Sequence, residues 1–172
     1  FDYDKIKNIL IASNKVKIYD PTNKTTIYSD KITYFKNKEL ILTDGNSKAI
    51  DKDTEIDAKD FEYNKIKNII YAKGNVKINN LKENYLIYSD KITYLKNDEL
   101  ILSEGNSKAI DEETQIDAKD FEYNKLSNIL LAKGKVKINN KKENYLIYSD
   151  KITYFKNDEL IYSQGNSKAI SD

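Results

Sequence analysis

The sequence contains neither cysteine nor histidine among its 172 residues. Without cysteine the chain can form no disulfide, no thiolate nucleophile and no thiolate metal site, and its redox compartment stays undetermined. Without histidine it also lacks the base of Ser-His-Asp and Cys-His catalysis and the imidazole ligands of zinc sites. These absences exclude those kinds of catalysis and metal site, and we expect a protein that is not an enzyme and that has no metal ion or other cofactor.

Arginine is also absent, so every positively charged side chain is lysine. The formal net charge is only +1, and lysine is interleaved with aspartate, glutamate and asparagine rather than clustered. Lysine lacks the planar guanidinium group with which arginine forms paired hydrogen bonds to phosphates and base edges. We therefore expect no nucleic-acid partner.

Long apolar runs are missing as well. No stretch approaches the roughly 20 residues that a transmembrane helix needs, and no signal peptide opens the sequence. The first residues, Phe1-Asp2-Tyr3, correspond to Phe61-Glu62-Tyr63 in the middle of a repeat. We expect a mature or excised segment with no transmembrane span in this chain.

A tandem repeat organises the whole sequence. The hexapeptide Ser-Asp-Lys-Ile-Thr-Tyr begins at Ser29, Ser89 and Ser149, so the period is 60 residues without insertion. Residues 1–60, 61–120 and 121–172 are three copies, and each copy consists of two related halves of about 30 residues. We expect one repeat domain, 1–172, that belongs to a longer array.

The hydrophobic pattern changes phase within each half-repeat. Ile87 has an odd residue number and Ile92 an even one. A straight strand turns residues of only one parity, either odd-numbered or even-numbered, toward a given face. The backbone must bend or bulge between the two isoleucines. We predict one corner at Asp90-Lys91 and a second at Gly105-Asn106.

Turn signals separate these bent segments. The turns at 64–68, 79–84, 96–98 and 111–114 are rich in asparagine and aspartate, and the intervening segments are rich in β-branched and aromatic residues without helical periodicity. An all-β fold follows. Alternating hairpins and corners predict two facing antiparallel sheets that form an elongated β-jelly-roll trough. A parallel β-helix is the competing architecture, although its coils rarely require hairpins.

Several motifs resemble the OstA-type repeat of lipopolysaccharide-transport proteins, which is the fold of LptA and of the N-terminal domain of LptD. They are Ser-Asp-Lys-Ile-Thr-Tyr at 89–94, Glu-Leu-Ile-Leu-Ser-Glu-Gly-Asn at 99–106, Asp-Ala-Lys-Asp-Phe-Glu-Tyr at 57–63 and Ala-Lys-Gly-Asn-Val-Lys-Ile at 72–78. The resemblance covers the whole chain. The copies here are more alike than the degenerate repeats of that family, and Asn14-Lys15 and Gly134-Lys135 replace Gly-Asn.

The resemblance implies a periplasmic module of a Gram-negative bacterium that shields lipopolysaccharide acyl chains in a hydrophobic trough on the way to the outer membrane. It also implies stacking end to end with copies of itself or with other OstA-like domains, because open sheet edges template strand pairing. Tethering to the outer membrane is a further expectation. The predicted lipid-binding lining is Ile27, Ile32, Tyr34, Leu40, Leu42, Phe61, Tyr63, Ile69, Tyr71, Val76, Ile78, Ile87, Ile92, Tyr94, Leu100, Leu102, Phe121, Tyr123, Ile129, Leu131, Val136, Ile138, Ile147, Ile152, Tyr154, Leu160 and Tyr162.

Two other interpretations compete with this one. The same residues can form an ordinary filled core, which makes the protein a structural spacer, stalk or scaffold. The repeated corner carboxylates Asp30, Asp90 and Asp150 suggest glycoside hydrolysis, although solvated turn chemistry explains them more simply. The width of the interior separates a carrier from a spacer, because a carrier must open along one side.

Overall fold

The computed structural model describes residues 1–171, and Asp172 lies outside the described part. Antiparallel strands make up nearly all of it, and the helical segments within this range are single turns of 3-10 helix. The strands are β1 (Asp2–Asp4), β2 (Ile9–Asp20), β3 (Thr25–Phe35), β4 (Leu40–Asp44), β5 (Ser47–Ile50), β6 (Thr54–Ala58), β7 (Asp60–Asn64), β8 (Ile69–Asn80), β9 (Tyr85–Leu95), β10 (Leu100–Ile110), β11 (Thr114–Asn124), β12 (Ile129–Asn140), β13 (Tyr145–Phe155), β14 (Leu160–Gln164) and β15 (Lys168–Ser171). The 3-10 turns are η1 (Lys36–Lys38), η2 (Lys96–Asp98) and η3 (Lys156–Asp158).

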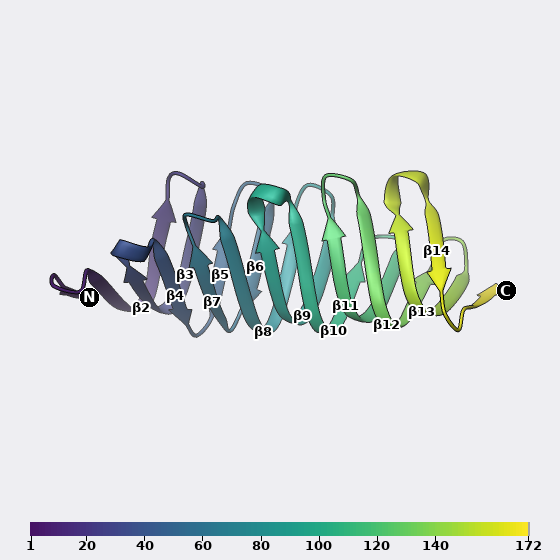
Figure 1. The fold of residues 1–172 in the computed structure, drawn as a ribbon, viewed down its shortest axis with the longest axis horizontal. Helices are drawn as coiled ribbons and strands as arrows, with labels where there is room; N and C mark the ends of the chain where they lie inside the picture. The colour runs from purple at the N-terminus through teal and green to yellow at the C-terminus, as the bar shows by residue number, and fades with distance from the viewer. Residues whose placement is uncertain (172) are drawn as a thin grey trace.

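Two layers of strands face each other along an elongated body, with the chain termini at opposite ends (Figure 1). The layer that we call the front sheet runs in the order β1-β2-β3-β4-β7-β8-β9-β10-β11-β12-β13-β14. The rear sheet contains β5, β6 and β15 together with the other halves of the long strands. The predicted all-β fold of two facing antiparallel sheets is confirmed, and the competing parallel β-helix is wrong.

The long strands bend from one sheet into the other at the predicted corners. The register of β9 with β10 shifts there, and Gly105 (φ +79°) and Asn106 (φ +48°) adopt left-handed backbone conformations. The Ser89 hydroxyl donates to the Gly105 carbonyl oxygen (3.0 Å), and the Asn106 side-chain amide donates to Asp90 Oδ2 (2.8 Å). Both predicted corners are confirmed, because the bulge absorbs the extra residue that the phase change requires.

Hairpins close the side opposite the corners, and asparagine and aspartate side chains stabilise them. In the front sheet, Asn64 Oδ1 accepts a hydrogen bond from the Lys67 amide (2.9 Å), and Asn68 takes a left-handed conformation (φ 52°). In the rear sheet, Asn80 Oδ1 accepts from the amides of Lys82 (3.0 Å) and Glu83 (2.7 Å). This local chemistry is the reason that the Asn-rich segments turn rather than extend.

Apolar side chains of one parity fill the space between the sheets. On the rear sheet, β-branched isoleucines dominate this inward row, and Ile78, Ile87 and Ile138 are at most 1% exposed. Such residues pack well on a pleated surface, and each buried side chain of this size contributes roughly 1.5–3 kcal/mol to folding. The core is therefore continuous along the chain.

Ten residues of the predicted lining face outward, and their predicted orientation is wrong. All ten lie in the half-strands adjoining the front hairpins, where the inward parity is instead carried by residues such as Ile70 and Ile101. Three consecutive apolar residues, as in Ile69-Ile70-Tyr71, leave the parity ambiguous in sequence, and the hairpin register decides it. The outward residues are Leu40, Leu42, Ile69, Tyr71, Leu100, Leu102, Ile129, Leu131, Leu160 and Tyr162.

Candidate functional site

The remaining seventeen predicted lining residues do lie on the inward side of the two sheets. Most are fully buried, whereas Tyr34, Ile147 and Tyr154 are partly buried and pack against the core. The inward set is Ile27, Ile32, Tyr34, Phe61, Tyr63, Val76, Ile78, Ile87, Ile92, Tyr94, Phe121, Tyr123, Val136, Ile138, Ile147, Ile152 and Tyr154. The interior is the candidate site.

Sequence reasoning missed an inward row on the front sheet in which aliphatic residues alternate with tyrosines. Strand pairing places Ile41 beside Tyr63, and Ile70 between Tyr63 and Tyr94. The missed aliphatic members are Ile41, Ile70, Ile101 and Leu130, which are at most 4% exposed. The hairpin register could have located them, because residues paired directly across two strands point to the same face. Each of these aliphatic residues is paired with an inward tyrosine and must therefore also point inward.

A polar seam joins the front hairpins to the rear hairpins on the side opposite the corners. The Tyr63 hydroxyl donates to Asp20 Oδ2 (2.9 Å), and Lys65 Nζ lies 4.0 Å from Asp20 Oδ1. Lys96 Nζ lies 3.0 Å from Asp51 Oδ2. Sixty residues further on, Lys156 Nζ lies 3.5 Å from Asp111 Oδ2, and the Tyr123 hydroxyl donates to Glu83 Oε2 (3.3 Å).

The seam depends on side chains. Among residues 1–171, no backbone-to-backbone hydrogen bond connects a front hairpin with a rear hairpin. On the corner side, by contrast, continuous backbone passes from one sheet to the other in every long strand. The two sides of the interior are therefore closed by different means, one covalent and one electrostatic.

Burial and charge pairing shift the pKa values of the seam residues. Burial raises the pKa of Tyr63, Tyr94 and Tyr123 well above the usual tyrosine value, so these hydroxyls stay protonated and donate. Burial alone also raises the pKa of Asp20, but hydrogen bonds from Asn23 and Tyr63 and the charge of Lys65 outweigh it. The net result is that the pKa of Asp20 is lowered, so it is an anion at neutral pH.

The interior is tightly filled. A cavity of about 30 Å³ lies between the sheets beside Tyr85, Ile87 and Tyr123, which is room for about one water molecule. Tyr85 and Tyr123 pack edge to face at 5.3 Å, and Lys156 Nζ lies 5.4 Å from the centre of the Tyr85 ring. An acyl chain fits between the sheets only if the seam separates.

The corner carboxylates do not form a catalytic pair. Asp30, Asp90 and Asp150 lie on β3, β9 and β13, so neighbouring members are four strands, or roughly 19 Å, apart. Paired carboxylates of glycosidases lie about 5–9.5 Å apart. Each of the three instead accepts a hydrogen bond from the asparagine of its own corner, at 2.7–2.8 Å. Their role here is to hold the bend.

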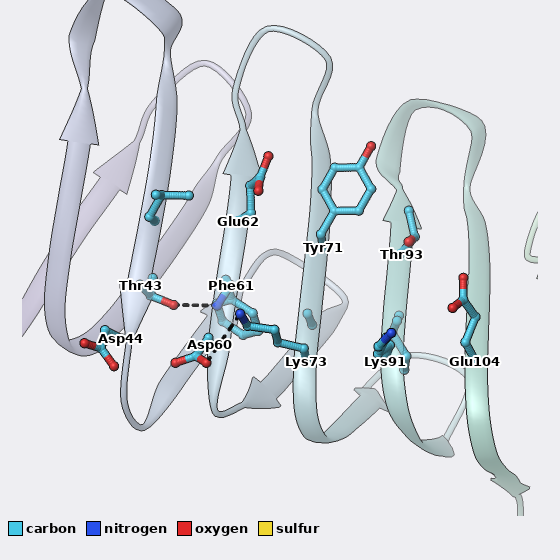
Figure 2. A pocket seen from close by; sticks show the side chains of 13 residues that line it. Thr43, Asp44, Asp60, Phe61, Glu62, Tyr71, Lys73, Lys91, Thr93 and Glu104 are labelled. Atoms are coloured by element: carbon cyan, nitrogen blue, oxygen red, sulfur yellow. Dashed lines mark hydrogen bonds and ion pairs between the residues drawn. The ribbon is translucent and has the colours of Figure 1, made fainter.

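A shallow groove recurs on the outer face of the front sheet. The first copy has a volume of about 630 Å³ and crosses β4, β7, β8 and β9, with Glu62, Tyr71 and Lys73 along it (Figure 2). The second copy, of about 610 Å³, lies sixty residues further along the chain. Acidic and lysine side chains alternate around both, and Lys73 Nζ lies 3.9 Å from Asp60 Oδ2.

The fold and the interior together define the class of protein: an elongated two-sheet β-jelly roll, closed by backbone along one side and by side chains along the other. A family model described as "Lipopolysaccharide-assembly, LptC-related" matches residues 2–141. The chain therefore belongs to the LptC-related lipopolysaccharide-assembly family. This finding confirms the resemblance to lipopolysaccharide-transport repeats.

Solved structures support the same fold. The crystal structure of LptH, the LptA-homologous periplasmic component of the lipopolysaccharide transport device of Pseudomonas aeruginosa, is similar at a TM-score of 0.51 and 13% identity. The match covers 77% of this chain and 87% of that chain. At this identity the likeness concerns the fold alone. No curated protein sequence matches the chain.

No helix within residues 1–171 is long and apolar enough to span a membrane. Within the same range, no cluster of three or more acidic side chains has the arrangement of a metal site. The interior and its polar seam thus remain the candidate site.

Proposed function

We propose that this chain is a periplasmic carrier module that shields the acyl chains of lipopolysaccharide, or of a similar amphiphile, during transport to the outer membrane. Membership of the lipopolysaccharide-assembly family supports the transport role. The observation that carries the finer proposal is the difference between the two sides of the interior. The backbone corners form a permanent hinge, whereas the seam consists of side-chain contacts that can separate and form again.

The energetics favour opening in the presence of lipid. Each methylene removed from water contributes about 0.8 kcal/mol, so a chain of a dozen carbons gains on the order of 10 kcal/mol before entropic losses. A solvent-exposed ion pair contributes about 0–1 kcal/mol, and in a more buried pair the cost of removing both charges from water offsets much of their attraction. A few seam contacts such as the one between Lys96 and Asp51 are therefore weaker than the burial of one acyl chain.

The open ends of the sheets support assembly into a longer conduit. The C-terminal end has a pocket of about 180 Å³ lined by Tyr145, Ile147, Ala169, Ile170 and Ser171. Tyr145, Ile147, Ala169 and Ser171 share the inward parity of β13 and β15, whereas Ile170 lies on the opposite parity beside Leu146. End-to-end pairing with another such domain would cover them and extend the interior from one module to the next.

A filled-core spacer is the second candidate, and the cavity of about 30 Å³ favours it. In that case the seam never opens and the array only spans a distance. The carrier function requires the two sheets to separate at the seam, whereas the spacer function does not. An experiment that locks the seam therefore distinguishes them.

The test uses a paired cysteine variant, because the chain has no cysteine of its own. Asp51→Cys with Lys96→Cys places one thiol on each side of the seam, and a short bis-maleimide linker then holds the sheets together. Lys73→Cys with Lys91→Cys is the control, because this linker joins neighbouring positions on β8 and β9 within one sheet. Uptake of fluorescent lipopolysaccharide is measured by gel filtration.

We expect uptake by the unlinked and control proteins, loss of uptake in the seam-linked protein, and recovery when a reducible linker is cut. Unchanged uptake by the seam-linked protein would show that the interior is not the binding site. If the wild-type protein takes up no lipopolysaccharide or other long-chain amphiphile, the spacer function replaces the carrier function.

A further inference from the structure

The register of the rear sheet assembles a row of lysine and tyrosine side chains along its outer face. The row takes one residue from each of eleven successive strands, and these residues lie far apart in the sequence. We call it the lysine–tyrosine row. Its members are Lys17, Tyr28, Lys48, Asp57, Lys77, Tyr88, Lys108, Asp117, Lys137, Tyr148 and Lys168.

The lysine–tyrosine row concentrates positive charge. It has six lysines and two aspartates, a formal charge of +4, although the whole chain carries only +1. Some of this charge is neutralised locally, because Lys48 pairs with Glu55 and Asp57, and Lys108 lies 3.6 Å from Asp117. Lys17 and Lys137 instead lie against tyrosine rings, which leaves their charges available.

The corresponding outer row of the front sheet shows that this concentration is not a general property of the repeat. There, pairs of lysines alternate with pairs of acidic residues, as Lys73 and Lys91 do with Asp60 and Glu104 (Figure 2). The full front row has five lysines and four acidic residues, namely Lys31, Asp44, Asp60, Lys73, Lys91, Glu104, Asp120, Lys133 and Lys151. Charge therefore cancels along the front face and accumulates along the rear face.

The spacing of the lysine–tyrosine row is regular. Lysine occupies every second strand, so the charges recur at intervals of roughly 10 Å over about 48 Å. Tyrosines stand between alternate lysine pairs, and Tyr28 and Tyr148 are both 37% exposed. Lys17 Nζ lies 5.5 Å from the Tyr28 ring centre, and Lys137 Nζ lies 5.9 Å from that of Tyr148.

We propose that the lysine–tyrosine row binds a linear anionic polysaccharide that lies along the long axis of the molecule. The lysine interval is similar to the length of two linked sugar rings in an extended chain, so carboxylate or sulfate groups meet successive ammonium groups. The intervening tyrosine rings offer apolar faces to the sugars. Lysine acts as a point charge, which suits such groups without the paired geometry that arginine provides.

The width of the row favours a polymer over a membrane surface. The adjacent outer row toward the hairpins contains no lysine and includes Tyr19, Ile50, Glu55, Leu86 and Ile110. On the hairpin side, positive charge therefore does not extend beyond the lysine–tyrosine row, whereas a planar anionic bilayer would contact a broad basic surface. The row lies outside the two sheets, so this binding does not depend on the carrier function of the interior.

The test compares two double variants on the same strands. Lys77→Gln with Lys137→Gln removes two charges from the lysine–tyrosine row, and Lys73→Gln with Lys133→Gln removes two from the front row of β8 and β12. Both pairs are sixty residues apart and change the net charge equally. Binding of a size-fractionated heparin oligosaccharide is measured by fluorescence anisotropy at low and moderate salt, with neutral dextran as the comparison.

We expect salt-sensitive binding of heparin, none of dextran, and affinity reduced roughly fivefold to tenfold by the rear variant but not by the front variant. Tyr88→Ala should weaken binding while leaving its salt dependence unchanged. An equal loss in both double variants would overturn the proposal, because net charge would then explain the binding. Failure of the wild-type protein to bind heparin at low salt, or tighter binding to phosphatidylglycerol vesicles or single-stranded DNA, would also overturn it.

Discussion

Two adjacent isoleucines on β8 test the orientation of the front sheet directly. Ile70 is 2% exposed and lies between Tyr63 and Tyr94 in the inward row, whereas Ile69 points outward between Asn64 and Leu95. Replacing Ile70 by alanine removes buried carbon atoms and leaves a cavity, which costs about 2–5 kcal/mol of unfolding free energy. The same change at Ile69 removes only partly buried surface, and we expect a cost of about 1 kcal/mol or less.

Urea unfolding followed by circular dichroism measures both variants against the wild type. Ile70→Ala should lower the urea midpoint strongly and Ile69→Ala only slightly, with the dependence of free energy on urea unchanged. For a chain of this size, each kcal/mol also lowers Tm by about 2–4 °C. Equal costs, or a larger cost at Ile69, would refute the orientation. A changed urea dependence would instead indicate that the repeats unfold separately.

Three further predictions concern the corners and the seam. Gly105→Ala should destabilise the protein by roughly 1–2 kcal/mol in urea unfolding, because φ is +79° and the new Cβ would lie 2.6 Å from Asp90 Oδ2. Asp51→Asn should cost about 1–3 kcal/mol, because it leaves the 8% exposed Lys96 without its anionic partner. Because the pKa of Asp20 is lowered on folding, its contribution to stability is present at neutral pH and is lost as pH falls below about 4.

Each of these three predictions has a companion variant and a result that would contradict it. Asn106→Gly at the same corner should cost less than Gly105→Ala, because its φ of +48° suits glycine and only the exposed hydrogen bond to Asp90 is lost. A larger loss than for Gly105→Ala would contradict the backbone argument. Lys96→Met with Asp51→Asn should recover part of the cost of the single Asp51 variant, and no recovery would argue against charge pairing. Asp20→Asn should flatten the acid dependence of Tm, and an unchanged profile would assign that dependence to other carboxylates.

Much of the fold was predictable because it depends on local chemistry that recurs every sixty residues. Alternating β-branched residues predict strands, asparagine-rich segments predict hairpins, and the opposite parities of Ile87 and Ile92 predict a bend at Asp90. In the half-strands next to the front hairpins, by contrast, odd-numbered and even-numbered residues are both apolar, so either set could face inward. Burying Ile70 rather than Ile69 follows from pairing with Tyr63 across a hairpin, and local pattern alone cannot decide it.

The sequence by itself determined the strand and turn pattern, the period and the presence of two facing sheets, because these depend on neighbouring residues. Only the tertiary structure decided how distant residues combine. Lys96 meets Asp51 because two hairpins from opposite sheets converge at the seam. Lys77 and Lys108 fall into one row because strand pairing aligns residues that the interleaved sequence separates, and register is a property of the assembled sheet.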